Sequence, residues 1–322
     1  MRAAALLFGL ALPLTAAAEE TAIVDIGVRR EARPFAWYDE ENRSPNGFLV
    51  DLCLDAVTNA GYAYRIRPVS ARERAGFLDG SADLGIDLLC DPTTMTMART
   101  RRFLEMAEAG QPPLGFSPIV FLANGTYFTK AAIGALPGHP APGDGTACHL
   151  IRQGTGAAEG DETPAPVYLT AGFVVGTTGQ EEIALTAAID IAQDRAEAAG
   201  DQYLCPMEFE THRDGVAAFC EPAGGLDFYF ADADILDAYM ALWEAETGKR
   251  CPRLPPRIRQ ISYEPYALVI SGRTPGFRDR FLKGLYEIFH RENLVAGRFA
   301  THFPGRRMSG YLETLFRIYA IP

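Results

Sequence analysis

The chain lacks three features that would place it in well-known functional classes: a dense basic stretch, a cluster of metal ligands, and a nucleophile motif. Its 30 Lys and Arg are outnumbered by 41 Asp and Glu, which gives a formal net charge of −11. This balance disfavours nucleic acid and anionic membrane surfaces as partners. The five histidines are scattered without metal-ligand spacing, and no phosphate loop or G-x-S-x-G elbow is present. The sequence therefore predicts no metal, no cofactor and no nucleophilic enzyme.

Long apolar runs are also scarce. After residue 18, no segment reaches the roughly 18 consecutive apolar residues that a membrane-spanning helix needs. The N-terminus has Arg2, then an apolar stretch over residues 3–14, then small residues up to Ala18. This order is typical of a secretory signal peptide over residues 1–18. We therefore predict an exported, periplasmic protein, and because no Cys follows the cleavage site, one without a lipid anchor.

The six cysteines are widely spaced and form no C-x-x-C pair. In an exported protein this pattern indicates disulfides rather than zinc. Six cysteines allow 15 pairings, and their spacing does not choose among them.

The order of predicted elements indicates an α/β fold. A β-branched strand is predicted over residues 23–28, a helix from Val50 to Gly61, and an alternating strand over residues 62–66, which together form a βαβ unit. A stretch rich in Gly, Pro and Ala over residues 131–166 separates two halves of similar pattern. We interpret this stretch as an insertion.

Two polar loops follow predicted strands. The first, LLCDPTTMTMART, leaves a strand over residues 84–89 and ends near Arg99. Hydroxyl groups followed by a guanidinium suit a small carboxylate, although a helix-capping loop would have the same composition. The second, GTTG over residues 176–179, precedes a helix and can form an anion-binding nest, although an ordinary turn is the alternative. Ligands of open α/β sheets bind at such strand ends.

Eight segments, in this order, resemble the family 3 solute-binding proteins, which are the periplasmic amino-acid-binding proteins of ABC importers. They are DIGVRREARPFAWYD, GFLVDLCLDAV, DLLCDPTTMTMAR, FSPIVF, VVGTTGQE, GGLDFYFAD, EPYALVISG and a C-terminal helix ending in AIP. The resemblance implies a type II two-lobe α/β fold with the ligand in a cleft between lobes joined by two hinge strands. Lobe 1 would comprise residues 22–123 and 264–322, and lobe 2 residues 124–263.

The same resemblance implies roles for individual residues. Arg99 would hold the α-carboxylate of an amino acid, with Thr94 nearby, and Thr177 and Thr178 would grip it from the other lobe. Asp232 would pair with the α-ammonium group. A zwitterion is costly to desolvate, so a dry cleft needs a fixed cation and a fixed anion of this kind.

Specificity would depend on the first loop. Arg29 stands where the family reads the ligand's side chain, and an Arg there favours an acidic ligand such as glutamate or aspartate; a solvated surface Arg is the alternative. Phe35 or Trp37 would pack on the ligand's aliphatic part or else belong to lobe packing. The resemblance places Cys53 and Cys90 in one lobe, which makes them our preferred disulfide.

Two departures from the family pattern affect the cleft rim: the extra segment FLEMAEAGQPPLG before FSP, and a long Gly- and Pro-rich stretch before GTTG.

The function implied is that of a monomeric, non-enzymatic receptor that delivers a polar L-amino acid to an inner-membrane ABC permease. One alternative is a sensory binding protein that reports to a membrane partner. Another is a cyclohexadienyl (prephenate-type) dehydratase on the same fold, with Glu181 or Glu182 as general acid.

Overall fold

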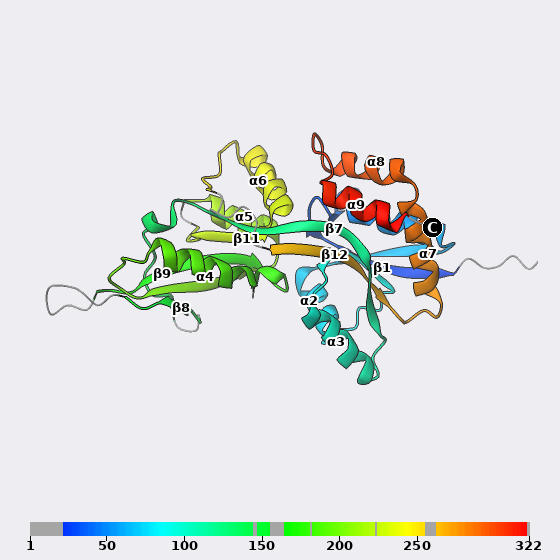
Figure 1. Ribbon diagram of the computed structural model, residues 1–322, viewed down its shortest axis with the longest axis horizontal. Coiled ribbons are helices and arrows are strands. Elements are labelled where there is room, and N and C mark those ends of the chain that lie inside the picture. Colours follow the sequence, from blue (N-terminus) through cyan, green and yellow to red (C-terminus); the bar gives the residue numbers. More distant parts are fainter. Residues whose placement is uncertain are drawn as a thin grey trace, which may run out of the picture.

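A computed structural model describes residues 22–143, 147–154, 164–180, 182–222, 224–254 and 262–320 (Figure 1). Over these residues the main sheet has nine strands in the order β5-β1-β6-β12-β7-β11-β9-β10-β8. Its strands are β1 (Ile23–Arg29), β5 (Ala63–Val69), β6 (Leu88–Thr94), β7 (Leu114–Thr129), β8 (His149–Arg152), β9 (Val167–Val174), β10 (Gln202–Phe209), β11 (Phe228–Asp232) and β12 (Ser262–Ser271).

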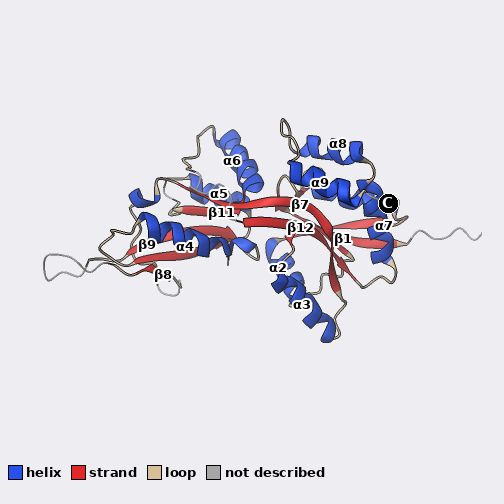
Figure 2. Cartoon of the chain, viewed as in Figure 1, coloured by secondary structure: helices blue, strands red, loops and turns tan. Residues whose placement is uncertain are grey.

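Helices cover both faces of this sheet (Figure 2). They are α1 (Phe48–Asn59), α2 (Ala71–Asp79), α3 (Met97–Glu108), α4 (Glu182–Asp194), α5 (His212–Cys220), α6 (Ala233–Thr247), α7 (Phe277–Phe289), α8 (Glu292–His302) and α9 (Gly310–Tyr319), with 3-10 turns η1 (Ile133–Ala135) and η2 (Thr178–Gln180). A small second sheet joins β2 (Glu31–Ala32), β3 (Ala36–Asp39) and β4 (Ser44–Asn46).

The molecule has two lobes joined by two long strands. β7 and β12 pair antiparallel and run from one half of the molecule into the other (Figure 1). We call the half that contains β1 lobe 1 and the half that contains β9 lobe 2. The predicted two-lobe α/β fold is confirmed, and the predicted lobe boundaries stay a prediction.

Local sequence rules account for the position of α2. Ser70 caps the helix: its Oγ accepts a hydrogen bond from the Glu73 N–H, and the Glu73 carboxylate accepts one from the Ser70 N–H. This reciprocal capping box satisfies two backbone donors that the first helical turn leaves without partners. The helix ends at Gly80, whose φ of 79° suits glycine. Both ends of α2 are therefore fixed by residues next to them in the chain.

The Thr-rich stretch differs from the prediction. The strand expected over residues 84–89 begins at Leu88 and continues through Thr94, where Thr93 and Thr94 pair with Ala267 and Tyr266 of β12. β-branched threonines suit a strand once a partner strand is available. The sequence pattern did not show that β12 supplies this partner from much later in the chain.

Disulfides join elements within each lobe. The predicted bond between Cys53 and Cys90 is confirmed, and it links α1 to β6. The other two pairs are Cys148 with Cys205 and Cys220 with Cys251. All six cysteines are therefore paired, as expected for an exported chain.

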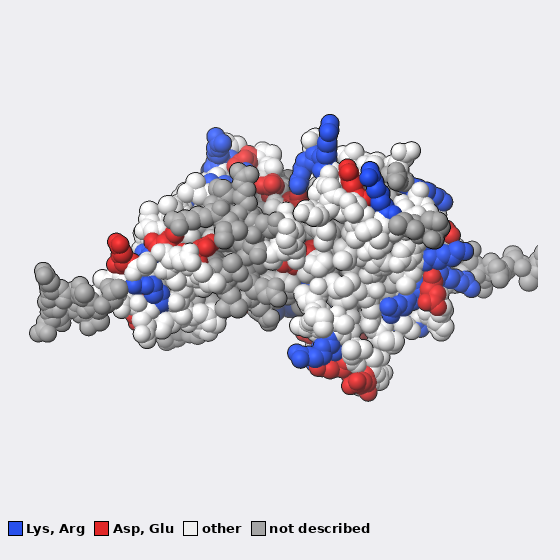
Figure 3. All heavy atoms as spheres, viewed as in Figure 1, with Lys and Arg blue, Asp and Glu red and all other residues white. Residues whose placement is uncertain are grey.

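The predicted signal peptide lies outside the described residues. Within them, no helix has both the length and the apolar character needed to cross a bilayer. On the face seen in Figure 3, acidic and basic side chains are interspersed.

Candidate ligand-binding site

A small cavity lies between the lobes, where several strands and helices end. The last residues of β1, β6 and β11 contribute to its wall, together with η2 and the first turn of α5. Its volume of about 30 Å³ has room for about two water molecules. Nine of its fourteen lining residues have polar side chains: Arg29, Arg74, Asp91, Thr94, Arg99, Thr177, Thr178, His212 and Asp232.

Arg29, the last residue of β1, brings a buried positive charge to this cavity. The residue is only 3% exposed, and its guanidinium makes no hydrogen bond or ion pair with any described residue. Burial lowers its pKa to about 10, with Asp91 opposing and Arg74 adding to the shift. Arg29 therefore remains charged at neutral pH, and its donors face the cavity.

Asp91 and Arg74 form a buried ion pair beside Arg29. The Arg74 Nε donates to Asp91 Oδ2, which also accepts from the Thr93 hydroxyl at 2.8 Å. Burial raises the pKa of Asp91, but Arg74 and Arg29 outweigh it, so the net shift is downward. The sequence analysis gave neither residue a role: Asp91 lies within the quoted segment DLLCDPTTMTMAR, whereas Arg74 lies in no quoted segment.

Arg99 joins the two lobes through backbone carbonyls. Its Nη1 donates to the Thr94 carbonyl at 2.7 Å, and its Nη2 donates to the Gly176 carbonyl of lobe 2 at 3.3 Å. Arg74 Nη1 donates to the same Gly176 carbonyl at 2.8 Å. Two guanidinium groups of lobe 1 therefore converge on one carbonyl of lobe 2.

The hydroxyl groups of the predicted GTTG loop also have partners within the protein. The Thr177 hydroxyl donates to the Val174 carbonyl at 2.7 Å, and the Thr178 hydroxyl donates to Glu264 Oε2 at 3.1 Å. Both residues line the cavity, and their predicted contact with a ligand carboxylate stays a prediction. Each hydroxyl would have to exchange its present acceptor for a ligand oxygen.

Asp232 supplies a carboxylate oxygen without a partner. Its Oδ2 accepts from the Tyr266 hydroxyl, whereas its buried Oδ1 has no hydrogen bond from the described residues. Burial raises the pKa of Asp232 well above its ordinary value, and the nearby carboxylates of Glu264 and Asp234 raise it further. A cationic group placed at Oδ1 would oppose this upward shift of the pKa.

His212 begins α5 at the buried side of the cavity. The residue is 3% exposed, and its Nδ1 lies 3.2 Å from the Tyr229 hydroxyl. Burial, assisted by the positive charge of Arg29, lowers its pKa to about 3. The imidazole is therefore neutral at physiological pH. The sequence analysis missed His212, because a lone histidine without a motif gives no signal.

His212 makes folding stability depend on pH. Since its folded pKa lies below the ordinary value of 6.5, the unfolded chain takes up a proton first as the pH falls. Between pH 7 and pH 5, we expect the parent protein to lose about 2 kcal/mol more unfolding free energy than a His212→Phe variant. Urea unfolding of both proteins at the two pH values measures the difference. Equal losses would show that the pKa of His212 is the same in the folded and unfolded states.

The two aromatic residues predicted to touch the ligand lie outside the cavity lining. Phe35 is fully buried and packs edge-on against Phe121, with ring centroids 4.7 Å apart. The ring of Trp37 lies 4.4 Å below the Arg33 guanidinium. Both serve lobe packing, which is the alternative that the sequence left open. The proposed general acid Glu181 lies outside the described residues, as does the side chain of Glu182.

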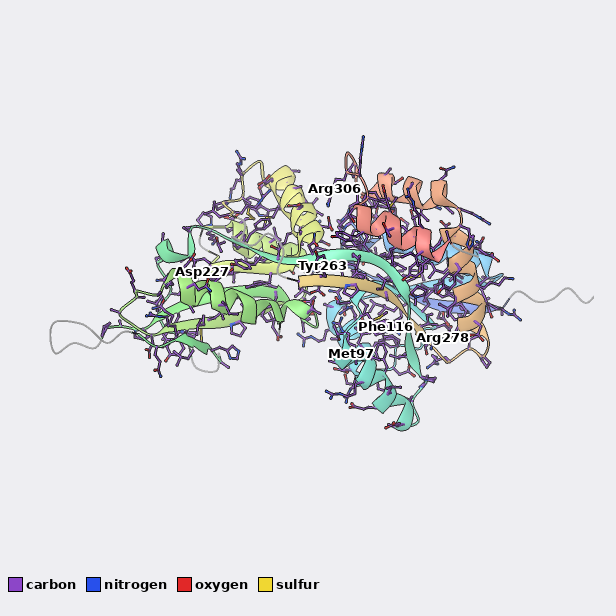
Figure 4. All side chains as sticks on the ribbon, viewed as in Figure 1. Met97, Phe116, Asp227, Tyr263, Arg278 and Arg306 are labelled. Atoms are coloured by element: carbon purple, nitrogen blue, oxygen red, sulfur yellow. A yellow bond between two sulfur atoms is a disulfide. The ribbon has the colours of Figure 1, made fainter. Side chains whose placement is uncertain are left out.

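A further contact between the lobes lies at the cleft rim. Arg306 Nη1 of lobe 1 donates to Asp234 Oδ1 at the start of α6 (Figure 4). Tyr263 lies on β12 between the lobes in the same view. The lobes therefore touch both inside the cleft and at its edge.

No protein-family model matches the chain, and no curated protein matches it significantly. Solved structures do match. The arginine-, lysine-, histidine-binding protein ArtJ from Geobacillus stearothermophilus is 15% identical, with a TM-score of 0.57 over 91% of this chain and 100% of that one. The substrate binding protein of an amino acid ABC transporter is 12% identical, with a TM-score of 0.57 over 88% of this chain and 99% of that one.

A third similar structure has a different role. It is a histidine kinase sensor domain described as similar to periplasmic binding proteins, and it is 14% identical, with a TM-score of 0.57 over 88% of this chain and 97% of that one. At these identities the similarity establishes the fold, which is that of the two-lobe periplasmic binding proteins.

Proposed function

We propose that this protein is an exported receptor that captures an acidic L-amino acid between its lobes and delivers it to an inner-membrane ABC permease. One observation carries the proposal. The cavity contains one basic and one acidic group without hydrogen-bond partners among the described residues: the Arg29 guanidinium and Asp232 Oδ1. Leaving such groups buried and unpaired is costly, so a ligand that satisfies both gains binding energy.

An amino acid with an acidic side chain fits this arrangement. Its α-ammonium group would pair with Asp232, and its side-chain carboxylate would pair with Arg29. Its α-carboxylate would take donors from Arg99 and Thr178, which at present donate to protein oxygens. The ligand would use groups from both lobes, and therefore stabilise the closed arrangement of the lobes.

A ligand can reach Arg29 and Asp232 together only if the lobes separate. The cavity has a volume of about 30 Å³, which suits about two water molecules rather than a whole amino acid. Because two strands, β7 and β12, run between the lobes, a hinge at these strands can open the cleft. The bonds to the Gly176 carbonyl would break on opening and be partly replaced by bonds to the ligand.

A thermal-shift screen tests the proposal. The mature protein would be heated with each of the twenty amino acids, with dicarboxylates and with prephenate, because a ligand that binds only the folded state raises its stability. We expect a clear rise with L-glutamate or L-aspartate. A rise with neutral amino acids alone would overturn the acidic specificity. Turnover of prephenate would contradict the proposal that the protein is a receptor, and would indicate a dehydratase instead.

The similar sensor domain supports a second candidate, in which the same receptor reports its ligand to a membrane partner. Uptake of the labelled amino acid by cells that lack the gene separates the two. Lost uptake supports import. Unchanged uptake together with a lost transcriptional response to the amino acid supports sensing.

Gly176 provides a test of closure that does not alter any side chain facing the ligand. Its φ is +70°, and an added Cβ would lie 2.7 Å from the Ala75 Cβ of α2, across the cleft. A Gly176→Ala variant relieves this clash only by opening the lobes, so we expect the Kd for L-glutamate to rise about tenfold. Isothermal titration calorimetry measures the change.

Gly225→Ala is the matched control. Gly225 has a φ of +69°, and an added Cβ would meet nothing within 4 Å. Both variants should lose about 1 kcal/mol of unfolding free energy through backbone strain. Only Gly176→Ala should lose affinity, and equal affinities of the two variants would contradict closure against α2.

A further inference from the structure

His212 and Arg29 contribute to the same small cavity from different lobes. Arg29 ends β1 of lobe 1, whereas His212 begins α5 of lobe 2, and both line the cavity. The proposed pairing of ligand charges uses Arg29 and leaves His212 without a role.

The position of the imidazole proton follows from Tyr229. Tyr229 is fully buried, and within the described residues its hydroxyl has one hydrogen-bond partner, His212 Nδ1 at 3.2 Å. If Nδ1 carried the proton, the Tyr229 O–H would be buried without an acceptor, which is costly. Tyr229 therefore donates to Nδ1, and the single proton of the neutral ring lies on Nε2.

The ring is also held in place. The Tyr229 ring lies edge-on to the imidazole, with centroids 6.3 Å apart, and the Tyr239 ring lies on another side at 5.6 Å. The N-cap Thr211, which accepts from the Asp214 N–H, fixes the start of α5. Nε2–H has no acceptor among the described residues, so it is a fixed donor beside the cavity.

Among Arg29, Arg74, Asp91 and His212, the charges add up to one excess positive charge. Arg74 pairs with Asp91, His212 is neutral, and Arg29 has no partner among the described residues. The groups without partners, the Arg29 N–H groups and the His212 Nε2–H, are all donors. A single anion that accepts from both would balance the charge.

We propose that Arg29 and His212 together bind the side-chain carboxylate of the ligand, with Tyr229 holding His212 as the Nε2–H tautomer. The N–H groups of Arg29 and His212 can donate to both oxygens of a carboxylate. A carboxamide fits this arrangement poorly, because its NH2 group is itself a donor and would face N–H groups of the protein. His212 is therefore a residue that determines specificity for an acid over its amide. This inference rests on the proposed amino-acid ligand.

The test compares L-glutamate with L-glutamine, and L-aspartate with L-asparagine, by isothermal titration calorimetry. We expect the parent to prefer the acid by about 100-fold or more. His212→Phe keeps a planar ring without the donor and should weaken acid binding by about 10- to 100-fold, while changing amide binding little. Tyr229→Phe leaves the cavity lining unchanged but removes the hydroxyl that keeps the His212 proton on Nε2. It should therefore reduce the preference for the acid by a smaller factor than His212→Phe does.

Tyr239→Phe is the matched control, because Tyr239 packs on the same imidazole without bonding its nitrogens. It should leave the acid preference unchanged. A preference that survives His212→Phe, or that falls equally in Tyr239→Phe, would overturn the role of His212. Melting curves of all three variants show that each is folded.

The ¹⁵N chemical shifts of the His212 ring give a readout that does not need the ligand. In the free protein they should show a proton on Nε2, which moves toward a mixture of tautomers in Tyr229→Phe. A proton on Nδ1 in the parent would overturn the inference. If the ring shows the Nε2–H tautomer but no acid or amide binds, the proposed function fails, and with it the ligand assignment that rests on it.

Discussion

Replacing Arg29 by methionine is expected to weaken L-glutamate binding by about 2–5 kcal/mol, because the change leaves the ligand's side-chain carboxylate buried without a cation. Methionine keeps most of the apolar stem and removes the charge. L-Glutamine, which has no charge at this end, should lose much less. Calorimetric titration of both ligands into parent and variant measures the two losses.

The neighbouring residue supplies the control. Arg30 is exposed and pairs with Glu40 on the surface, so Arg30→Met should leave both affinities unchanged. Without ligand, Arg29→Met should not lower the unfolding free energy, because the cost of burying the Arg29 charge outweighs its attraction to Asp91. A variant that binds L-glutamate as tightly as the parent, or that loses glutamate and glutamine affinity equally, would refute the assignment.

Replacing Asp91 by alanine is expected to lower the unfolding free energy by about 3–5 kcal/mol. The side chains of Asp91 and Arg74 are only 1% and 4% exposed, and removal of one partner leaves the other charge buried. The loss is increased because Arg29, also buried, is attracted to the same carboxylate. Urea unfolding at pH 7 without ligand measures this change.

The pair between Asp25 and Arg65 is a matched control in the same lobe. Its side chains are 35% and 69% exposed, so solvent screens the attraction. Asp25→Ala should lose no more than about 1 kcal/mol. Losses of similar size in Asp25→Ala and Asp91→Ala would mean that the buried pair is no more important for folding than a surface pair.

The sequence by itself determined those features that depend on neighbours in the chain. The strand and helix patterns indicated the α/β fold, and Ser70, Glu73 and Gly80 set the ends of α2. The roles expected of Arg29 and Asp232 came from the resemblance to the family 3 solute-binding proteins, and the structure places each as the last residue of a strand.

The tertiary structure decided which groups meet. Arg74 bonds a carbonyl 102 residues away, and Tyr229 orients a histidine 17 residues earlier in the chain. It also gave Arg99, expected to hold the ligand, two backbone acceptors, and it placed Phe35 in the core. Periodicity and capping act over a few residues, whereas these contacts exist only because the two lobes and their sheet bring distant segments together. Only the tertiary structure decides whether a buried charge has a partner within the protein or remains available to a ligand.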